Sequence, residues 1–77
     1  QMVTYNLINK LKELGLLEEC INKGVVSFKY PIWVDLYDFY IHQLTIEPSR
    51  MQCITNTSDK FSYSDNMTRY IIKTMEN

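Results

Sequence analysis

The stretch Ser49–Met75 reads SRMQCITNTSDKFSYSDNMTRYIIKTM, and its pattern predicts two helices joined by a tight turn. Ser49 is followed three residues later by Gln52, the spacing of a capping box, in which each side chain can bond the free backbone N–H of the other residue. Pro48 cannot continue an earlier helix, so we expect the first of the two helices to begin just after it. Ser64 stands where the second helix needs an N-cap.

Residues recur at helical spacing in both halves of this stretch, so each helix should have an inward face. The first helix is expected to turn inward Met51, Ile54, Ser58 and Phe61. The second is expected to turn inward Thr68, Ile71, Ile72 and Met75. The opposite face of the second helix carries Asp65, Asn66, Arg69, Tyr70 and Lys73. All five of these side chains could touch a polar partner.

The run SDKFSYSDNMTRYIIKTME at positions 58–76 resembles the segment AxxFxVSxxTVxRIIKxME of small bacterial and phage helix-turn-helix proteins, which bind DNA. The matching residues are Phe61, Ser64, Ile71, Ile72, Lys73, Met75 and Glu76. The departures are Ser58 for Ala, Ser62 for Gly or Asn, Tyr63 for Val, Met67 for a phosphate-touching Thr, Thr68 for Val, and Tyr70 for Arg. The resemblance covers about a third of the chain and implies a helix-turn-helix at residues 49–76.

The resemblance implies double-stranded DNA as the partner, with residues 64–73 lying on the major groove. Ser64 would cap the second helix, whose N-terminal N–H groups favour a nearby phosphate. Asn66 can pair with an adenine edge through two hydrogen bonds. Arg69 and Lys73 are four residues apart and share a face, so both could reach bases or backbone. Tyr70 could donate its hydroxyl to a phosphate, which completes the predicted DNA-binding set.

The composition is that of an ordinary globular protein of one domain. The chain has 77 residues, of which 45% are hydrophobic and 22% charged. No apolar run approaches the ~20 residues that cross a membrane, and no signal-peptide pattern is present, so we expect a cytoplasmic protein. Gln1 is not a natural start, so it is either a remnant ahead of Met2 or the chain is a piece of a longer protein. Cys20 and Cys53 lack metal-ligand spacing and should be reduced, with a disulfide as the alternative.

The charge is not that of a strong nucleic-acid binder. The net charge is −1: residues 1–48 hold four lysines and six acids (−2), and residues 49–77 hold two arginines, two lysines and three acids (+1). Affinity for the phosphate backbone comes largely from the counterions that Lys and Arg release. A monomer should therefore bind DNA weakly, and a dimer or a longer parent chain would be needed.

Residues 1–24 predict two short helices. Thr4 should cap the first, and Gly15 should end it. Its inward side is expected to be Leu7, Ile8, Leu11 and Leu14. The second, LLEECINK, should end at Gly24 in the same way. Its inward side is expected to be Leu17, Cys20 and Ile21.

VVSFKY at positions 25–30 predicts an extended connector that completes the N-terminal part, residues 1–30. Tyr30 precedes Pro31, which disfavours a helical conformation for Tyr30. We expect the apolar side chains of the connector to plug the core. The alternative is an exposed strand that pairs with its copy in another subunit.

Residues 31–46 begin with PIWVDLYDFYIHQL, the most apolar part of the chain, and Pro31 suits the first turn of a helix. One stripe of this helix is Val34, Tyr37, Ile41 and Leu44. Much of the remaining surface is Trp33, Leu36, Phe39 and Tyr40. A helix that is apolar on most sides is buried on most sides, so we expect the central post of the fold. The alternative is a homodimer interface through the aromatic side chains of Trp33–Tyr40.

No catalytic, metal or cofactor site is indicated. His42 is the only histidine, and Asp35 and Asp38 have the spacing of solvated charges on one helix face. We therefore expect a non-enzyme: an all-α single domain spanning residues 1–77, a small bundle of about five helices that ends in a helix-turn-helix. Two functions stay open. The first is a DNA-binding module, either a transcriptional regulator or a phage or mobile-element protein, and the second is a helical interaction or assembly module that does not read DNA.

Overall fold

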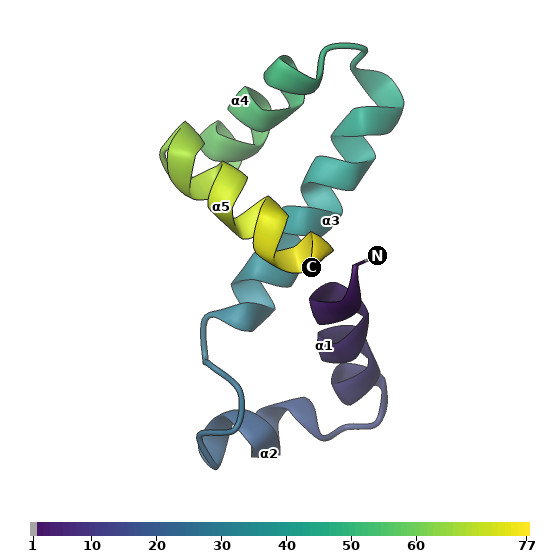
Figure 1. Cartoon of the computed structure of the whole chain (residues 1–77), viewed down its shortest axis with the longest axis vertical. Coiled ribbons are helices and arrows are strands. Elements are labelled where there is room, and N and C mark those ends of the chain that lie inside the picture. The colour runs from purple at the N-terminus through teal and green to yellow at the C-terminus, as the bar shows by residue number, and fades with distance from the viewer. Residues whose placement is uncertain (1) are drawn as a thin grey trace.

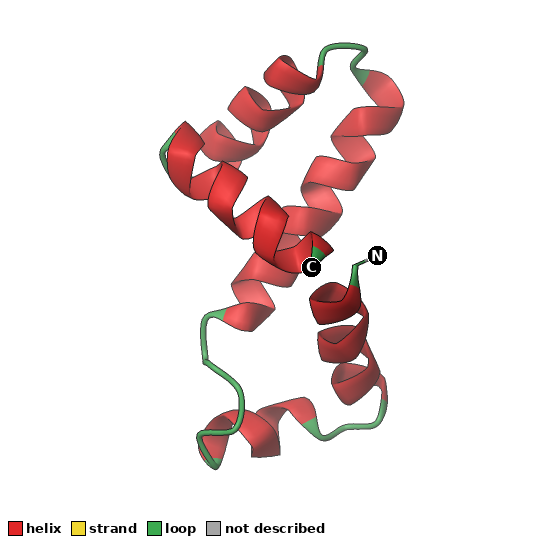
Figure 2. Cartoon of the chain, in the orientation of Figure 1, coloured by secondary structure: helices red, strands yellow, loops and turns green. Residues whose placement is uncertain are grey.

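The computed structural model describes residues 2–77, and every regular element in that range is an α-helix (Figure 1, Figure 2). The helices are α1 (Val3–Glu13), α2 (Leu17–Asn22), α3 (Tyr30–Ile46), α4 (Arg50–Phe61) and α5 (Asp65–Glu76). The prediction of an all-α bundle of about five helices is confirmed. Our expectation for Gln1 lies outside the described residues.

The helix α3 is the central post of the fold. Figure 1 shows α4 folding back beside it and α5 crossing it, and α1 packs on it as well. Its buried side chains are Trp33, Val34, Leu36, Tyr37 and Tyr40. The buried apolar side chains of α5 that pack in the same cluster are Ile71, Ile72 and Met75. Aromatic rings bury large apolar areas, so the three aromatic side chains of α3 supply much of the core.

The aromatic side chains of α3 are used inside the monomer. Trp33, Tyr37 and Tyr40 are buried, and Phe39 is half-buried against Phe61, with their ring centroids 6.1 Å apart. These rings are packed against α1, α4 and α5, which leaves little of them exposed for a partner, and the homodimer through Trp33–Tyr40 stays a prediction.

Glycines end the two N-terminal helices as predicted. Gly15 follows α1 with φ +72° and Gly24 follows α2 with φ +77°, a region of backbone conformation that glycine adopts without strain. After α1, the N–H of Leu16 donates to the carbonyl oxygen of Leu11 (2.9 Å), and the N–H of Gly15 donates to that of Lys12 (3.1 Å). These two bonds are a Schellman motif, which satisfies the last free carbonyls of the helix.

The start of α1 differs from the prediction, because Thr4 is not its cap. The helix begins at Val3, and no side chain caps it. Instead, the N–H of Met2 donates to the carbonyl oxygen of Glu76 (2.9 Å) and the N–H of Thr4 donates to that of Asn77 (2.7 Å). The free carbonyls that end α5 thus satisfy free N–H groups that begin α1, and the two helix dipoles align favourably.

The face through which α1 packs also differs from the prediction. Ile8 is buried, but Leu7 and Leu14 are 57% and 58% exposed. The ring of Tyr5 packs edge-on against the ring of Tyr37 in α3, with centroids 4.9 Å apart. The apolar stripe of α1 is wider than the face that docks, and the bonds to the end of α5 fix the rotation that turns Tyr5 and Ile8 inward.

Residues 23–29 form turns and bends. The prediction of an extended connector whose apolar side chains fill the core is therefore wrong. Val25 and Phe28 are 75% and 81% exposed, and only Val26 packs against the core. The helix α3 already begins at Tyr30, because the proline after it falls in the first turn, where a missing N–H costs no hydrogen bond. The expected inward side of α2 is only half-buried, at Leu17, Cys20 and Ile21.

The predicted inward face of α4 is confirmed at Ile54 and Ser58, and Phe61 is half-buried against the core, but Met51 does not belong to it. Met51 is 66% exposed. In α3, the predicted stripe is likewise wrong at its C-terminal end, where Leu44 is 45% exposed. The buried residues of α4 are Cys53, Ile54, Thr57 and Ser58. The hydroxyls of Thr57 and Ser58 lie 2.8 and 2.9 Å from the carbonyl oxygens four residues earlier in α4. These bonds allow two polar residues to be buried, of which Thr57 was not predicted.

Candidate functional site

The helices α4 and α5 are joined by a three-residue turn, and both begin with the predicted serine cap. The side chain of Ser49 accepts the N–H of Gln52 (3.2 Å), and that of Ser64 accepts the N–H of Met67 (3.1 Å). The capping box at Ser49 is only half formed, because the side chain of Gln52 donates to Asn56 within the helix. The caps set where each helix begins, and so they set which residues α5 presents on each face.

A buried pair of hydroxyl groups joins α4 to α5. The Oγ of Ser58 lies 2.8 Å from the Oγ1 of Thr68, and both side chains are buried. Each hydroxyl thus gives the other a partner away from water.

The inward stripe of α5 is confirmed, and its opposite face is exposed. Thr68, Ile71, Ile72 and Met75 are buried, and Met67 is half-buried. The exposed residues of the predicted set are Ser64, Asn66, Arg69, Tyr70 and Lys73. The structure thus places Asn66, Arg69, Tyr70 and Lys73 along one exposed side of α5, with Ser64 as the N-cap of the helix.

Two of these residues, Tyr70 and Arg69, contact side chains of other helices. The ring of Tyr70 packs edge-on against Trp33 of α3, with centroids 5.9 Å apart. An Nη of Arg69 lies 3.9 Å from the sulfur of Met51 in α4. The exposed face of α5 is therefore attached to the core through α3 and to α4 through a methionine.

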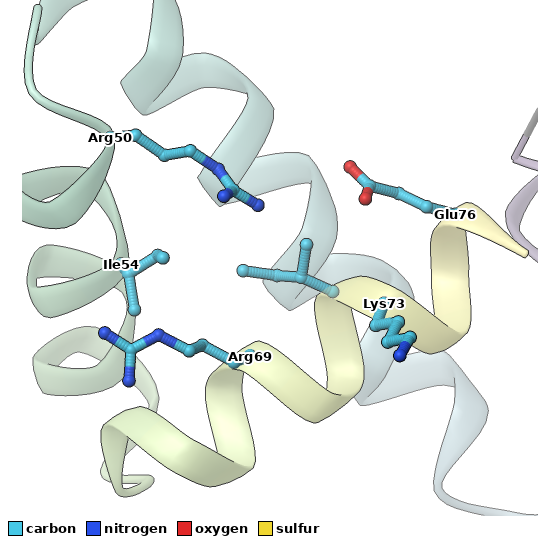
Figure 3. A pocket seen from close by; sticks show the side chains of 6 residues that line it. Arg50, Ile54, Arg69, Lys73 and Glu76 are labelled. Atoms are coloured by element: carbon cyan, nitrogen blue, oxygen red, sulfur yellow. The ribbon is translucent and has the colours of Figure 1, made fainter.

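A hollow of about 240 Å³ lies between α4 and α5, beside this exposed face (Figure 3). Its lining is Arg50, Ile54, Arg69, Ile72, Lys73 and Glu76. Two residues of the predicted set, Arg69 and Lys73, thus lie on its edge, while Asn66 and Tyr70 do not line it. Figure 3 shows Arg50 reaching across from α4 toward Glu76 of α5.

Arg50 is the residue of this region that sequence reasoning missed. Its Nε donates to the hydroxyl of Tyr40 (2.9 Å), and this bond is the main cause that raises the pKa of Arg50 above its usual value. Opposite, the hydroxyl of Tyr37 donates to the carboxylate of Glu76 (3.1 Å). Burial, with Glu76 as the second cause, raises the pKa of Tyr37 to about 12. Two tyrosines of α3 thus hold the charged groups that face each other across the hollow.

Within residues 2–77, no three His, Cys, Asp or Glu side chains are grouped to hold a metal ion. Cys20 and Cys53 are free thiols, and His42 is exposed. The hydroxyl of Tyr5 donates to Asp38, and this bond raises the pKa of Tyr5. None of the helices in the described range is long and apolar enough to cross a bilayer.

The chain matches no protein-family model, and comparisons with curated proteins and with solved structures find no similar protein. A functional assignment therefore has to be drawn from the geometry of α4 and α5.

Proposed function

We propose that this chain is a DNA-binding module of the helix-turn-helix type without enzymatic activity. It would serve in the cytoplasm as a transcriptional regulator or as a DNA-binding protein of a phage or mobile element. The observation that carries the proposal is the division of α5 into a buried apolar face and an exposed polar face that begins at a capped N-terminus. A helix held in this way can enter the major groove of DNA without losing its place in the core.

The exposed face of α5 has the chemistry that such a contact needs. Asn66 lies in the first turn, where its amide could pair with an adenine edge. Arg69 and Lys73 follow one and two turns later, where they could bind a guanine edge or the phosphate backbone. Asp65, also in the first turn, would repel phosphate, so we expect this end of the helix to face bases.

The charge near this face also favours DNA over a protein partner. The hollow beside it is lined only by residues of α4 and α5, so no acid of the N-terminal half covers it. Three of its six lining residues are Arg50, Arg69 and Lys73, and one is the acidic Glu76. A positive surface next to an exposed helix is what backbone phosphates require.

A second candidate function is a helical protein-interaction module, which a different part of the surface favours. Seven of the eleven large hydrophobic residues that are exposed in residues 2–77 lie at positions 3–32. Within that part, α2 buries none of its side chains. Exposed apolar side chains that gather on one surface are typical of contacts with another protein.

Single substitutions on α5 test the proposal through the salt dependence of binding. We expect Arg69→Ala and Lys73→Ala each to weaken binding to a labelled mixed-sequence duplex and to lower the slope of log affinity against log salt by roughly 0.9. Asn66→Ala should leave the slope unchanged and relax base preference at one position by roughly 1–3 kcal/mol. Lys23→Ala, at the exposed end of α2, is the charge-matched control. Equal effects of Lys23→Ala and Arg69→Ala would contradict a contact through α5.

A further inference from the structure

The hollow between α4 and α5 concentrates most of the positive charge of the C-terminal part of the chain. Residues 49–77 contain four basic residues, and three of them, Arg50, Arg69 and Lys73, line this one hollow. They come from two helices: Arg50 is the first residue of α4, and Arg69 and Lys73 are one turn apart on α5. With Glu76 included, the charges around the hollow sum to +2.

The hydrogen-bond partners of Arg50 and Arg69 are neutral groups, so they do not neutralise the positive charge of either arginine. The Nε of Arg50 donates to the hydroxyl of Tyr40, a neutral group, and an Nη of Arg69 lies against the sulfur of Met51. The bond to Tyr40 (2.9 Å) uses only one edge of the Arg50 guanidinium and fixes its direction into the hollow. Its remaining N–H groups form the planar fork that matches a phosphate.

The hollow also has the size and the floor for a bound group. Its volume of about 240 Å³ is far more than a single water molecule needs. Ile54 and Ile72 line it between the charged residues, so an anion would meet a surface less hydrated than open solvent. Electrostatic attraction is stronger where water is partly displaced.

We propose that this hollow holds one phosphate group of the backbone of double-stranded DNA, with Arg50 as its principal ligand and Arg69 and Lys73 at its edge. The inference rests on the proposed function and adds a residue from a second helix to it. A phosphate bound between α4 and α5 would fix the angle at which α5 lies in the groove. Phosphate contacts set the register and orientation of a protein on DNA, whereas base contacts set its specificity.

Substitution of Glu76 tests the direction in which the affinity for DNA should change. Figure 3 shows its carboxylate pointing toward the guanidinium of Arg50, so it competes with a phosphate for the same charge. The hydroxyl of Tyr37 that donates to this carboxylate can donate equally to an amide oxygen. Glu76→Gln therefore removes the competing charge while it keeps the hydrogen bond, and it should strengthen binding.

The test compares Arg50→Gln, Arg50→Lys, Glu76→Gln and Lys23→Gln on two duplexes of unrelated sequence, by fluorescence anisotropy at several salt concentrations. Arg50→Gln should lower the slope of log affinity against log salt by roughly 0.9 on both duplexes. Arg50→Lys should keep the slope but bind less tightly, because it keeps the charge and loses the fork. Glu76→Gln should bind more tightly than wild type, and Lys23→Gln should lose less than Arg50→Gln. Thermal melts should show that all four variants remain folded.

Three results would overturn the proposal, and they separate it from the proposed function. If wild type binds no duplex at any salt, the proposed function and this site both fail. If wild type binds and Arg69→Ala weakens it, while Arg50→Gln behaves like Lys23→Gln, only the site in the hollow fails. If Arg50 is needed for binding inorganic phosphate or phosphatidylglycerol vesicles but not the duplex, the hollow binds an anion other than the DNA backbone.

Discussion

The hydroxyl pair Ser58–Thr68 gives a prediction whose size follows from the hydrogen bonds. Ser58→Ala would leave the buried hydroxyl of Thr68 without the partner that lies 2.8 Å away. A buried group left unpaired costs about 1–3 kcal/mol of the free energy of unfolding. Thr68→Val should cost less, about 0.5–1.5 kcal/mol, since Ser58 keeps its bond to the carbonyl of Ile54 (2.9 Å). The double variant Ser58→Ala, Thr68→Val should be near wild type, because both partners are removed together and no hydroxyl is left unpaired.

Chemical denaturation of the four proteins of this cycle measures the coupling directly. We expect the double variant to be more stable than Ser58→Ala alone by about 1 kcal/mol or more. Thr57→Val is the matched control, because its buried hydroxyl bonds only a carbonyl of its own helix and should show no coupling to Thr68→Val. A neutral Ser58→Ala, or a double variant as destabilised as the sum of the two single variants, would refute the hydroxyl pair as the join between α4 and α5.

Two further predictions concern stability. Ile8→Ala should lower the free energy of unfolding by about 2–4 kcal/mol and Leu7→Ala by less than about 0.5 kcal/mol, because Ile8 is buried and Leu7 is exposed. Equal losses in urea unfolding would contradict the observed face of α1. Because the pKa of Tyr37 is raised from 10.0 to about 12, the folded state keeps the proton that the unfolded chain releases, so stability should fall as pH rises from about 10 to about 12. Tyr37→Phe should remove that part of the pH dependence, and an unchanged pH profile would contradict the raised pKa of Tyr37.

The parts of the fold that the sequence predicted are those with local signals. The caps at Ser49 and Ser64 and the glycine ends at Gly15 and Gly24 depend on residues within one turn of the helix, and all four are present. The exposed face of α5 was predicted for the same reason, since its buried stripe has clear helical spacing.

The parts that could not be predicted depend on tertiary contacts. The rotation of α1 is set by bonds from Met2 and Thr4 to the far end of the chain, which no local pattern contains. The buried face of α4 includes Thr57, which is polar and so gives no apolar signal. Arg50 was missed because only folding brings residue 50 beside residues 69 and 73.

The proposed binding of duplex DNA by the exposed face of α5 can be tested by comparing two triple variants. The triple variant Asn66→Ala, Arg69→Ala, Lys73→Ala is compared with wild type and with Asn6→Ala, Lys10→Ala, Lys23→Ala, which removes the same number of amides and charges from exposed positions on α1 and α2. The measurement is the affinity for one mixed-sequence duplex as a function of salt. We predict that the α5 variant loses most of the affinity and lowers the salt slope by roughly 1.8, while the control keeps both close to wild type. An α5 variant that remains folded and binds the duplex as tightly as wild type would contradict the proposal.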